Sequence, residues 1–437
     1  MHVDITTLQD LSIFHHEEEQ SAFHHLDFTH TNGGRDYLHY ILSNTLDSIA
    51  EIEDSQRLIK KMMMVSAQWP ATITNGTIMV IERFYDTPVD AYPPHPSVFN
   101  SFIYKLMNAG DYSLTRYSVE HFISFVQGYK KIVDLLGEIE CRQLQTWIER
   151  VKQLLGRPSV QQMLEWKKEE KLSPLKALTF GVFLRHHFKH EAFELIDIYS
   201  RLDAYLSLAL AFQKYKLCFP SFVETNTPFI EAEQLYHLQL DVPVSYNVSL
   251  NQEKNFLFLT GANMAGKSTF IKAVGICVYL AHIGMGVPAA SMQLCLFEGL
   301  LSNIHVVDNI LKGESYFFNE VQRIKSTIEK INDGKKWLIL IDELFKGTNV
   351  QDAMKCSTVV IEGLLKMRNA LFILSTHLYE IGDDLKKYNN IQFRYFETTV
   401  SDEQLVFSYQ LKEGISNDRL GYLILKREGV VGMLEKL

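Results

Sequence analysis

Residues 261–269 read Gly-Ala-Asn-Met-Ala-Gly-Lys-Ser-Thr, and they lie between an apolar run, 256–260, and a helical pattern. Glycines at both ends of such a loop let backbone amides curl inward around an anion, and the helix that follows adds its N-terminal dipole. The lysine then reaches the outer phosphates of a nucleotide, and the serine hydroxyl ligates magnesium. The sequence therefore predicts a phosphate-binding loop formed by Gly261, Ala262, Asn263, Met264, Ala265, Gly266, Lys267, Ser268 and Thr269.

Two further apolar runs, 337–341 and 370–375, also lead into polar turns and helical patterns. This alternation predicts buried parallel strands separated by helices. Asp342 and Glu343 follow the first run and His377 follows the second, so all three belong to the carboxyl edge where such sheets bind ligands. We expect Asp342 to hold magnesium through water, Glu343 to orient and deprotonate an attacking water, and His377 to sense the terminal phosphate.

The first half of the chain has a helical pattern. Apolar residues recur at spacings of three and four over 119–136 and again over 195–212. We expect the first seam to belong to one long helix from about residue 117 to 155, roughly 50–60 Å at 1.5 Å per residue, with a kink at Gly137. Proline-containing turns predict short helices over 156–190, at the far end of an antiparallel helix pair.

A chain of 437 residues exceeds what one hydrophobic core usually serves. We therefore expect a multidomain protein, with an all-α domain over 1–215 followed by an α/β P-loop NTPase domain over 216–437. Residues 216–250 mix prolines with alternating polar and apolar side chains, which predicts strands and loops at the start of the second domain.

Charge is unevenly distributed along the chain. Residues 1–250 carry 22 basic and 31 acidic side chains, whereas the remainder carries 21 of each. Residues 141–190 nevertheless hold ten basic side chains against four acidic ones, which favours contacts with phosphates, although a solvated helical face explains such a window equally well. The basic residues are Arg142, Arg150, Lys152, Arg157, Lys167, Lys168, Lys171, Lys176, Arg185 and Lys189.

Several classes of protein are disfavoured. The longest uncharged stretch, 273–297, is interrupted by polar residues, glycines and a proline before it reaches bilayer length, so we expect no membrane segment. The N-terminus lacks the basic and apolar runs of an export signal. Five widely spaced cysteines suit a reducing cytoplasm. His186-His187 with His190 lack a fixed set of further ligands, and we expect them to be solvated or to face DNA rather than to bind a metal. The pairs His15-His16 and His24-His25 are assigned no role.

These motifs resemble those of the MutS family. The string 260–269, with Asn-Met between its glycines, is similar to the phosphate-binding loop of that family, and 280–289 resembles the segment that follows it. The later motifs Asp342-Glu-Leu-Phe-Lys-Gly-Thr348, Ser375-Thr-His377 and Gly414-Ile-Ser416 through Gly421 occur in the family's order. In the first half, residues 8–35 look like the opening of the family's core lever domain, while the resemblance over 60–190 is loose.

The resemblance implies a lever/core domain joined to an ATPase domain of the ABC type, with ATP and Mg²⁺ as ligands. It also implies a homodimer with composite ATP sites, in which Ser315, within Gly313-Glu314-Ser315, contacts the ATP held by the other subunit. The family's N-terminal mismatch-reading and connector domains have no counterpart in this sequence, and we expect at most a reduced clamp near 156–190. Val244 stands where the family often has an adenine-stacking aromatic, with Tyr246 as a substitute.

Two functions follow as expectations. The first is an ATP-dependent DNA-binding protein of the MutS type, hydrolysing ATP to ADP and phosphate to switch a dimeric clamp on mismatched, branched or recombining DNA through backbone contacts. The alternative is a MutS-like ATPase that grips a protein partner, which the acidic balance of residues 1–250 favours. A transporter-type ATPase subunit is disfavoured because its Ser-Gly-Gly-Gln signature is missing.

Overall fold

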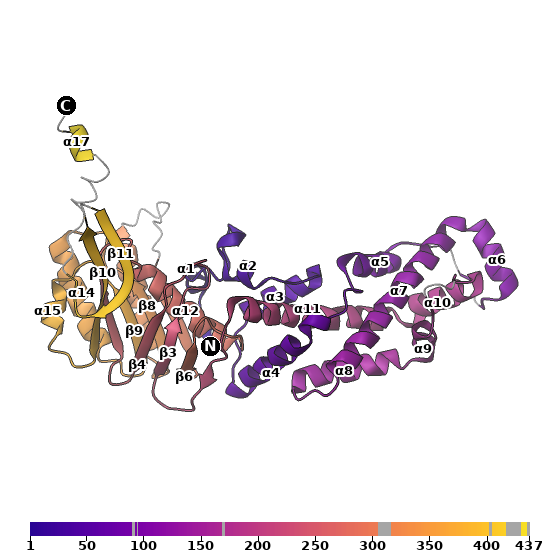
Figure 1. Ribbon diagram of the computed structural model, residues 1–437, viewed down its shortest axis with the longest axis horizontal. Coiled ribbons are helices and arrows are strands. Elements are labelled where there is room, and N and C mark those ends of the chain that lie inside the picture. Colours follow the sequence, from indigo (N-terminus) through magenta and orange to yellow (C-terminus); the bar gives the residue numbers. More distant parts are fainter. Residues whose placement is uncertain are drawn as a thin grey trace. The chain divides into compact units, whose positions relative to one another are not determined.

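The computed structural model describes residues 1–89, 92–93, 95–167, 171–304, 316–401, 404–416 and 430–434. The chain divides into two compact units. Unit 1 contains Met1–His25, Thr45–Ile52 and Tyr215–Leu437, and unit 2 contains Leu26–Asn44 and Glu53–Lys214. The described residues form a mixture of helices and two sheets, as expected of a multidomain α/β protein (Figure 1).

The division differs from the predicted 1–215 and 216–437, because the N-terminal residues belong to unit 1. A two-residue strand there, β1 (His2–Val3), pairs in parallel with β7 (Gly299–Asn303). Asp10 is buried and accepts hydrogen bonds from the Ser302 hydroxyl (2.6 Å), the Ile304 amide (3.0 Å) and the Arg323 guanidinium (3.0 Å). These contacts with residues 292 to 313 positions away hold the N-terminus in unit 1.

Unit 1 is built on a seven-stranded sheet in the order β1-β7-β8-β9-β5-β10-β11. Its other strands are β5 (Phe256–Thr260), β8 (Trp337–Asp342), β9 (Ala370–Ser375), β10 (Ile391–Ser401) and β11 (Gln404–Glu413). All pairs are parallel except β10 with β11. The three apolar runs of the sequence are thus adjacent central strands, as predicted, and every residue of β5, β8 and β9 is buried.

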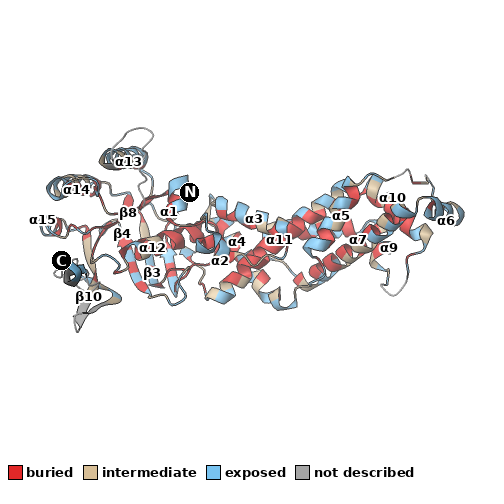
Figure 2. Cartoon of the chain, turned by 90° about the horizontal axis from the view of Figure 1, so that it is seen from above, coloured by how far each residue is buried: buried red, intermediate tan, exposed pale blue. Residues whose placement is uncertain are grey.

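Helices cover both faces of this sheet. Alternate residues of the central strands, such as Phe258, Ile339 and Phe372, pack with α13 (Tyr316–Ile331), α14 (Val350–Leu364) and α15 (Ile381–Leu385) in one apolar core. The helix α12 (Lys267–His282) contacts β8 and β9 from the opposite face (Figure 2). Burial on both faces explains why these strands are continuously apolar rather than alternating.

The smaller elements of unit 1 complete the domain. A second sheet in the order β2-β6-β3-β4 consists of β2 (Ser221–Phe222), β3 (Phe229–Leu235), β4 (Tyr246–Asn251) and β6 (Ser291–Leu294). Strands therefore occur within 216–250, as predicted. The remaining helices are α1 (Ile5–Asp10), η1 (Glu18–Gln20), α2 (Ala22–Leu26), at whose last residue unit 2 begins, and α17 (Val430–Leu434).

Within the described residues of unit 2, the regular elements are all helices. It comprises α3 (Asn32–Ser43), α4 (Ile49–Val65, from Glu53 onward), η2 (Ser66–Gln68), α5 (Asn75–Asp86), α6 (Val98–Met107), α7 (Ala109–Leu136), α8 (Arg142–Leu155), α9 (Pro158–Leu164), α10 (Pro174–His187) and α11 (Lys189–Tyr215, to Lys214). The predicted helix from 117 to 155 is wrong, because Gly137 ends α7 with φ of 53° instead of kinking it. The short helices over 156–190 are confirmed as α9 and α10.

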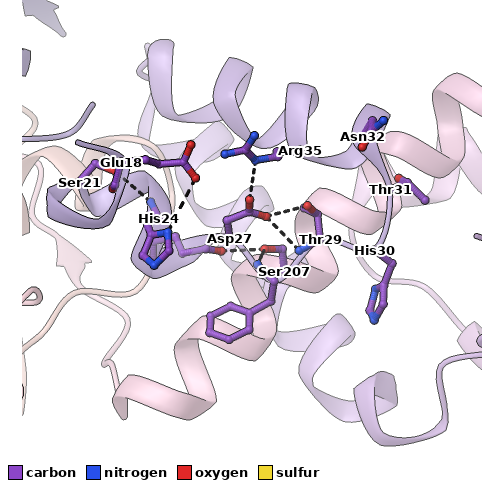
Figure 3. A network of polar contacts seen from close by, with 12 residues as sticks. Glu18, Ser21, His24, Asp27, Thr29, His30, Thr31, Asn32, Arg35 and Ser207 are labelled. Atoms are coloured by element: carbon purple, nitrogen blue, oxygen red, sulfur yellow. Dashed lines mark hydrogen bonds and ion pairs between the residues drawn. The ribbon is translucent and has the colours of Figure 1, made fainter. Parts of the chain in front are cut away.

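Residues 26–35 are fastened to α11 by two buried side chains, Ser207, which Figure 3 shows, and Asp203. The Ser207 hydroxyl donates to the Leu26 carbonyl and accepts from the Phe28 amide. The Asp203 carboxylate accepts from the amides of His30 (3.0 Å) and Thr31 (2.8 Å) and from the Thr31 hydroxyl (2.7 Å). A Cβ on Gly34 would lie 2.2 Å from this carboxylate, so the close approach requires glycine.

Candidate functional site

The predicted phosphate-binding loop connects β5 to α12. Gly266 caps the helix with φ of 106°, and Gly261 has φ of 136° with Phe396 packed against its Cα. Met264, which is 77% exposed, also has a positive φ, 68°. Left-handed conformations at three positions turn the loop tightly enough to present amides ahead of the helix N-terminus, which is a good anion site.

Lys267 is buried in this loop, with 5% of its surface exposed. Its ammonium donates to the carbonyls of Gly261 (2.8 Å) and Ala262 (3.0 Å). Burial lowers the pKa of Lys267 from its ordinary value, whereas Glu343 and Asp342 act in the opposite direction. A desolvated cation held by neutral carbonyls gains from a phosphate anion placed beside it.

The predicted magnesium ligands meet at the ends of two elements. The Ser268 hydroxyl, in the first turn of α12, donates to Asp342 Oδ2 at 2.5 Å. Ser375, at the end of β9, donates to the other oxygen of the same carboxylate. Both groups offer oxygen ligands, which Mg²⁺ prefers, and Ser375 fixes the orientation of Asp342.

Glu343 follows β8 in a left-handed conformation, with φ of 63°. Its amide donates to the Ser375 carbonyl at 3.0 Å, and its Oε2 lies 3.7 Å from His377 Nδ1 and 3.3 Å from Lys346 Nζ. The pKa of Glu343 is lowered to about 2, mainly by His377 and also by Lys346, while burial opposes the shift. Glu343 is therefore ionised at neutral pH, and strain of this kind is common at functional sites.

These residues line a cavity of about 630 Å³, which also contains Lys346 and Tyr409. Its lining includes Lys267, Ser268, Asp342 and Glu343, so the loop and the acidic pair share one space. His377 reaches this group through Glu343. The structure thus brings the predicted site residues of 261–269, 342–343 and 377 together.

One wall of the cavity is apolar, and the sequence predicted only some of the residues that form it. Val244 and Tyr246, the two candidates for stacking on a base, both line it. His237, Leu240 and Tyr409 were not predicted, because they come from a loop and a distant strand that share no motif with 261–269. The Tyr409 ring would lie 3.4 Å from a Cβ on Gly266, and burial lowers the pKa of His237 to about 4, so this imidazole is neutral at pH 7.

Ser315, which was predicted to contact the ATP of the other subunit, lies outside the described residues, as do Gly313 and Glu314. Glu320, on α13, accepts from the amides of Lys346 (3.0 Å) and Gly347 (3.2 Å) and so fixes the loop after the acidic pair. The Ser416 amide donates to the Thr260 hydroxyl at 2.9 Å, which ties residues 414–416 of the last motif to the strand before the loop, while 417–421 lie outside the described residues. No group of three potential metal-binding side chains occurs among the described histidines, cysteines and acids.

Of the ten basic side chains in residues 141–190, several are already paired within unit 2. Arg150 forms a bidentate pair with Glu194 (2.7 and 2.8 Å), and Arg157 pairs with Glu191 at 2.6 Å. Arg185 donates to backbone carbonyls of unit 2, including that of Phe84 at 2.6 Å. The exposed basic residues that remain in the described part of the window are Arg142, Lys152, Lys167, Lys171, Lys176 and Lys189, while Lys168 lies outside it.

Comparison with known proteins finds one family domain in this part of the chain. MutS domain V matches residues 257–431, which include the loop, the acidic pair and His377. The matched part of the chain is therefore a MutS-family domain. It is 30% identical to human "MutS protein homolog 4" over 241 residues, which are 53% of this chain and 25% of that protein. It is 26% identical to "DNA mismatch repair protein MutS" of Petrotoga mobilis over 267 residues, 60% of this chain and 32% of that protein.

A further MutS relative, from Streptococcus pyogenes serotype M5, is 27% identical over 286 residues, 63% of this chain and 32% of that protein. The matched region of this chain therefore spans about a quarter to a third of the length of these relatives. Within the described residues, no helix is both long and apolar enough to cross a membrane.

Proposed function

We propose that this chain is a Mg²⁺-dependent ATPase that binds DNA and changes its grip with the state of the nucleotide. One observation carries the ATPase proposal. The Ser268 hydroxyl and the Asp342 carboxylate meet at 2.5 Å on the wall of a cavity that also holds Lys267 and Glu343. A cation, two oxygen ligands for a metal and an ionised carboxylate are the groups that hydrolysis of a nucleoside triphosphate requires.

Each side chain has a role in this proposal. Lys267 and the amides of 261–269 would bind the phosphates, and Ser268 with Asp342 would hold magnesium, which neutralises developing charge on the phosphates when it is bound. Glu343 would orient the attacking water and accept its proton, held in place by its own amide and by His377. Val244, Tyr246 and Tyr409 would form an apolar surface for the base.

The strand order supports an ATPase domain of the ABC type. The strand that precedes the loop, β5, and the strand that carries the acidic pair, β8, are separated by β9, which ends at Ser375 next to His377. All three are parallel, so their carboxyl ends lie at one edge and bring the catalytic side chains together. All five cysteines are free thiols, which supports a cytoplasmic protein.

Binding of Mg-ATP by the full chain tests the site. Lys267→Ala should weaken binding at least about tenfold, because it removes the cation that faces the phosphates. Lys325→Ala, which removes an exposed lysine of α13, is the matched control and should leave affinity unchanged. Equal affinity of the wild-type and Lys267→Ala chains for Mg-ATP would exclude this loop as the nucleotide site.

We further propose a homodimer with composite ATP sites, to which Ser315 contributes from the other subunit, by resemblance to the family. Mixing a Lys267→Ala chain with a Ser315→Arg chain should then restore hydrolysis, because each heterodimer keeps one intact composite site. Activity no greater than the sum of the separate variants would remove Ser315 from this role.

DNA is the proposed macromolecular ligand because two relatives carry the name "DNA mismatch repair protein MutS". The exposed lysines of unit 2 could contact phosphates without reading bases. A panel of duplex, mismatched, four-way and forked DNA, measured with and without ATP, tests this proposal. We expect binding that depends on DNA shape and on ATP, and no affinity for any member of the panel would contradict it.

A protein partner is the second candidate for the ligand of unit 2. The pairing of Arg150 and Arg157 with acidic neighbours favours it, because these residues are less available to a polyanion. Salt dependence separates the two candidates, since DNA binding releases counterions and its affinity falls steeply with salt.

A further inference from the structure

The helix α6 of unit 2 presents an apolar face to solvent. Its exposed apolar residues are Val98 (75% exposed), Phe99 (76%), Phe102 (53%), Ile103 (36%), Leu106 (66%) and Met107 (79%). The residues that it buries against α7 and α10 are Ser101 and Tyr104. The Ser101 hydroxyl has no hydrogen-bond partner among the described residues. This arrangement is the reverse of an ordinary surface helix, which buries its apolar stripe. Figure 2 shows α6 at the end of unit 2 beside α10, largely exposed.

The helix is nevertheless a well-defined element. Ser97 caps its N-terminus, with its hydroxyl accepting from the Asn100 amide, and the Asn100 side chain accepts from the Ser97 amide in return. Such a capping box fixes the first turn. The apolar side chains are therefore presented on a fixed helix face.

The exposed area is that of a protein interface. With full accessible areas of roughly 150–250 Å² for side chains of this size, the exposed fractions leave on the order of 800 Å² of apolar surface. A monomer's largest apolar patch is usually about 300–600 Å², whereas one side of a standard interface covers about 800 Å². The exposed apolar area of α6 is therefore larger than the usual patch of a monomer and similar to one side of a standard interface.

The pattern of the apolar positions points to an identical partner. The pairs 98–99, 102–103 and 106–107 are evenly spaced, so reversing the helix about the midpoint of 102 and 103 exchanges 98 with 107 and 99 with 106. After this reversal, each apolar position of one helix takes the place of another apolar position. A two-fold symmetric contact requires this kind of self-complementary surface, and antiparallel helices with such stripes interdigitate.

Charge disfavours other occupants. Lys105 is the one charged residue of α6, and its ammonium lies over the ring of Tyr112, 5.6 Å from the centroid. A neutral face offers nothing to the phosphates of DNA or to an acidic peptide. A membrane-surface helix needs several lysines or arginines on its polar side, but α6 has only Lys105, and its polar residues Ser101 and Tyr104 are buried in its own unit.

We propose that α6 pairs with α6 of a second copy of this chain, antiparallel about a two-fold axis between Phe102 and Ile103. This contact is separate from the proposed composite ATP site and needs no nucleotide. Its failure would therefore leave the proposed ATPase untouched, and loss of ATP binding would leave the pairing of α6 intact.

Sedimentation of the full chain in buffer free of nucleotide and magnesium tests the pairing. We expect wild-type chains to dimerise and Phe102→Asp to weaken the dimer at least about thirtyfold, because a charge would be buried at the centre of the contact. Met64→Asp, which alters an apolar residue of α4 that is more exposed (79%) than Phe102 (53%), should leave the dimer unchanged, as should Lys267→Ala.

Cysteine crosslinking gives a readout that leaves the apolar face almost intact. Phe102→Cys and Ile103→Cys chains should form disulfide-linked dimers on mild oxidation, because both positions lie next to the axis. Met64→Cys chains, which keep the same five natural cysteines, should not form such dimers.

Any of three results would overturn the proposal. One is a wild-type chain that stays monomeric at micromolar concentration, and another is a dimer that Phe102→Asp does not weaken. The third is a monomer that co-sediments with phosphatidylcholine and phosphatidylserine vesicles through Phe102, which would make the occupant a membrane.

Discussion

Glu343 is the residue on which the proposed chemistry depends most. Its left-handed backbone, the bond from its amide to the Ser375 carbonyl and its position beside His377 and Lys346 fix its carboxylate next to the ligands proposed for magnesium. The low pKa of Glu343 keeps it ionised, so it accepts hydrogen bonds rather than donating them. That state suits a group that orients water, and the proton is taken up only as charge develops on the attacking oxygen.

At the same scale, His282 links stability to pH. Its Nε2 accepts from the Phe297 amide at 3.0 Å, so Nδ1 carries the proton and donates to the Val278 carbonyl at 2.7 Å. Burial lowers the pKa of His282 to about 4. Because the unfolded chain takes up this proton near pH 6.5, the free energy of unfolding should fall as the pH is lowered from 6.5 towards 4, by at most about 1.4 kcal/mol per pH unit.

Urea denaturation at pH 7, 6 and 5 measures this effect. His237 contributes with the same sign, because burial lowers its pKa to about 4 as well. His282→Gln should therefore remove roughly half of the dependence that the two histidines cause. A pH dependence of unfolding that is the same in wild-type and His282→Gln chains would contradict the assignment.

At the scale of elements, the segment 26–35 is held to α11 mainly by Asp203. This carboxylate is fully buried and accepts bonds from two backbone amides and a hydroxyl. Asp203→Ala should cost about 3 kcal/mol of unfolding free energy, because it leaves buried donors without an acceptor. Chemical denaturation of the full chain measures this cost.

Asp197→Ala is the matched control on the same helix. Asp197 pairs with Arg201 at 2.7 Å, but its side chain is 54% exposed, so its removal should cost no more than about 1 kcal/mol. Equal losses for the two variants would show that Asp203 contributes no more than an exposed ion pair.

Local patterns made the core of the site predictable. The loop 261–269 and the strands β5, β8 and β9 are recognisable because glycine spacing and short apolar runs lie within a few residues of one another. The break at Gly137 was not predictable from its neighbours alone. Asp54, which lies 88 and 89 residues earlier in the chain, accepts from the amides of Arg142 and Gln143 at 3.1 Å and so starts α8 as a separate helix.

Contacts between residues far apart in the sequence account for the features that local patterns did not predict. Glu191 and Glu194 lie 34 and 44 residues from the arginines that they neutralise, so counting charges over 141–190 overestimated the surface available to phosphates. The strand β1 is only two residues long and forms against β7, almost 300 residues away. Tyr409 enters the cavity only because β11 pairs with β10 beside the loop.

At the scale of the whole molecule, the exposed lysines of the basic window should determine the salt dependence of DNA binding. The four to be changed are Lys152, Lys167, Lys171 and Lys176, each exposed in unit 2. Lys189 is also exposed but is kept, because its ammonium lies over the Tyr85 ring. For duplex DNA, log affinity falls linearly with log salt concentration. Changing a lysine that contacts a phosphate to glutamine should make this slope less steep by about 0.9. Preference among base sequences should not change, because phosphate contacts carry no sequence information.

Fluorescence titrations of labelled duplex at several salt concentrations measure this slope. The matched control changes four exposed lysines of unit 1 to glutamine and should leave the slope unchanged. Those lysines are Lys325, Lys355, Lys366 and Lys386. An unchanged slope in the unit 2 variant would favour a protein partner for this surface over DNA.

The central claim, that this chain hydrolyses ATP with Glu343 as the base, is tested most directly by single-turnover hydrolysis of bound Mg-ATP. Glu343→Gln should bind Mg-ATP with nearly wild-type affinity and release phosphate at least about a hundredfold more slowly, because the amide orients water but accepts no proton. Glu329→Gln, an exposed change on α13, should hydrolyse ATP at the wild-type rate. A Glu343→Gln chain that turns over bound ATP as fast as the wild type would contradict the account.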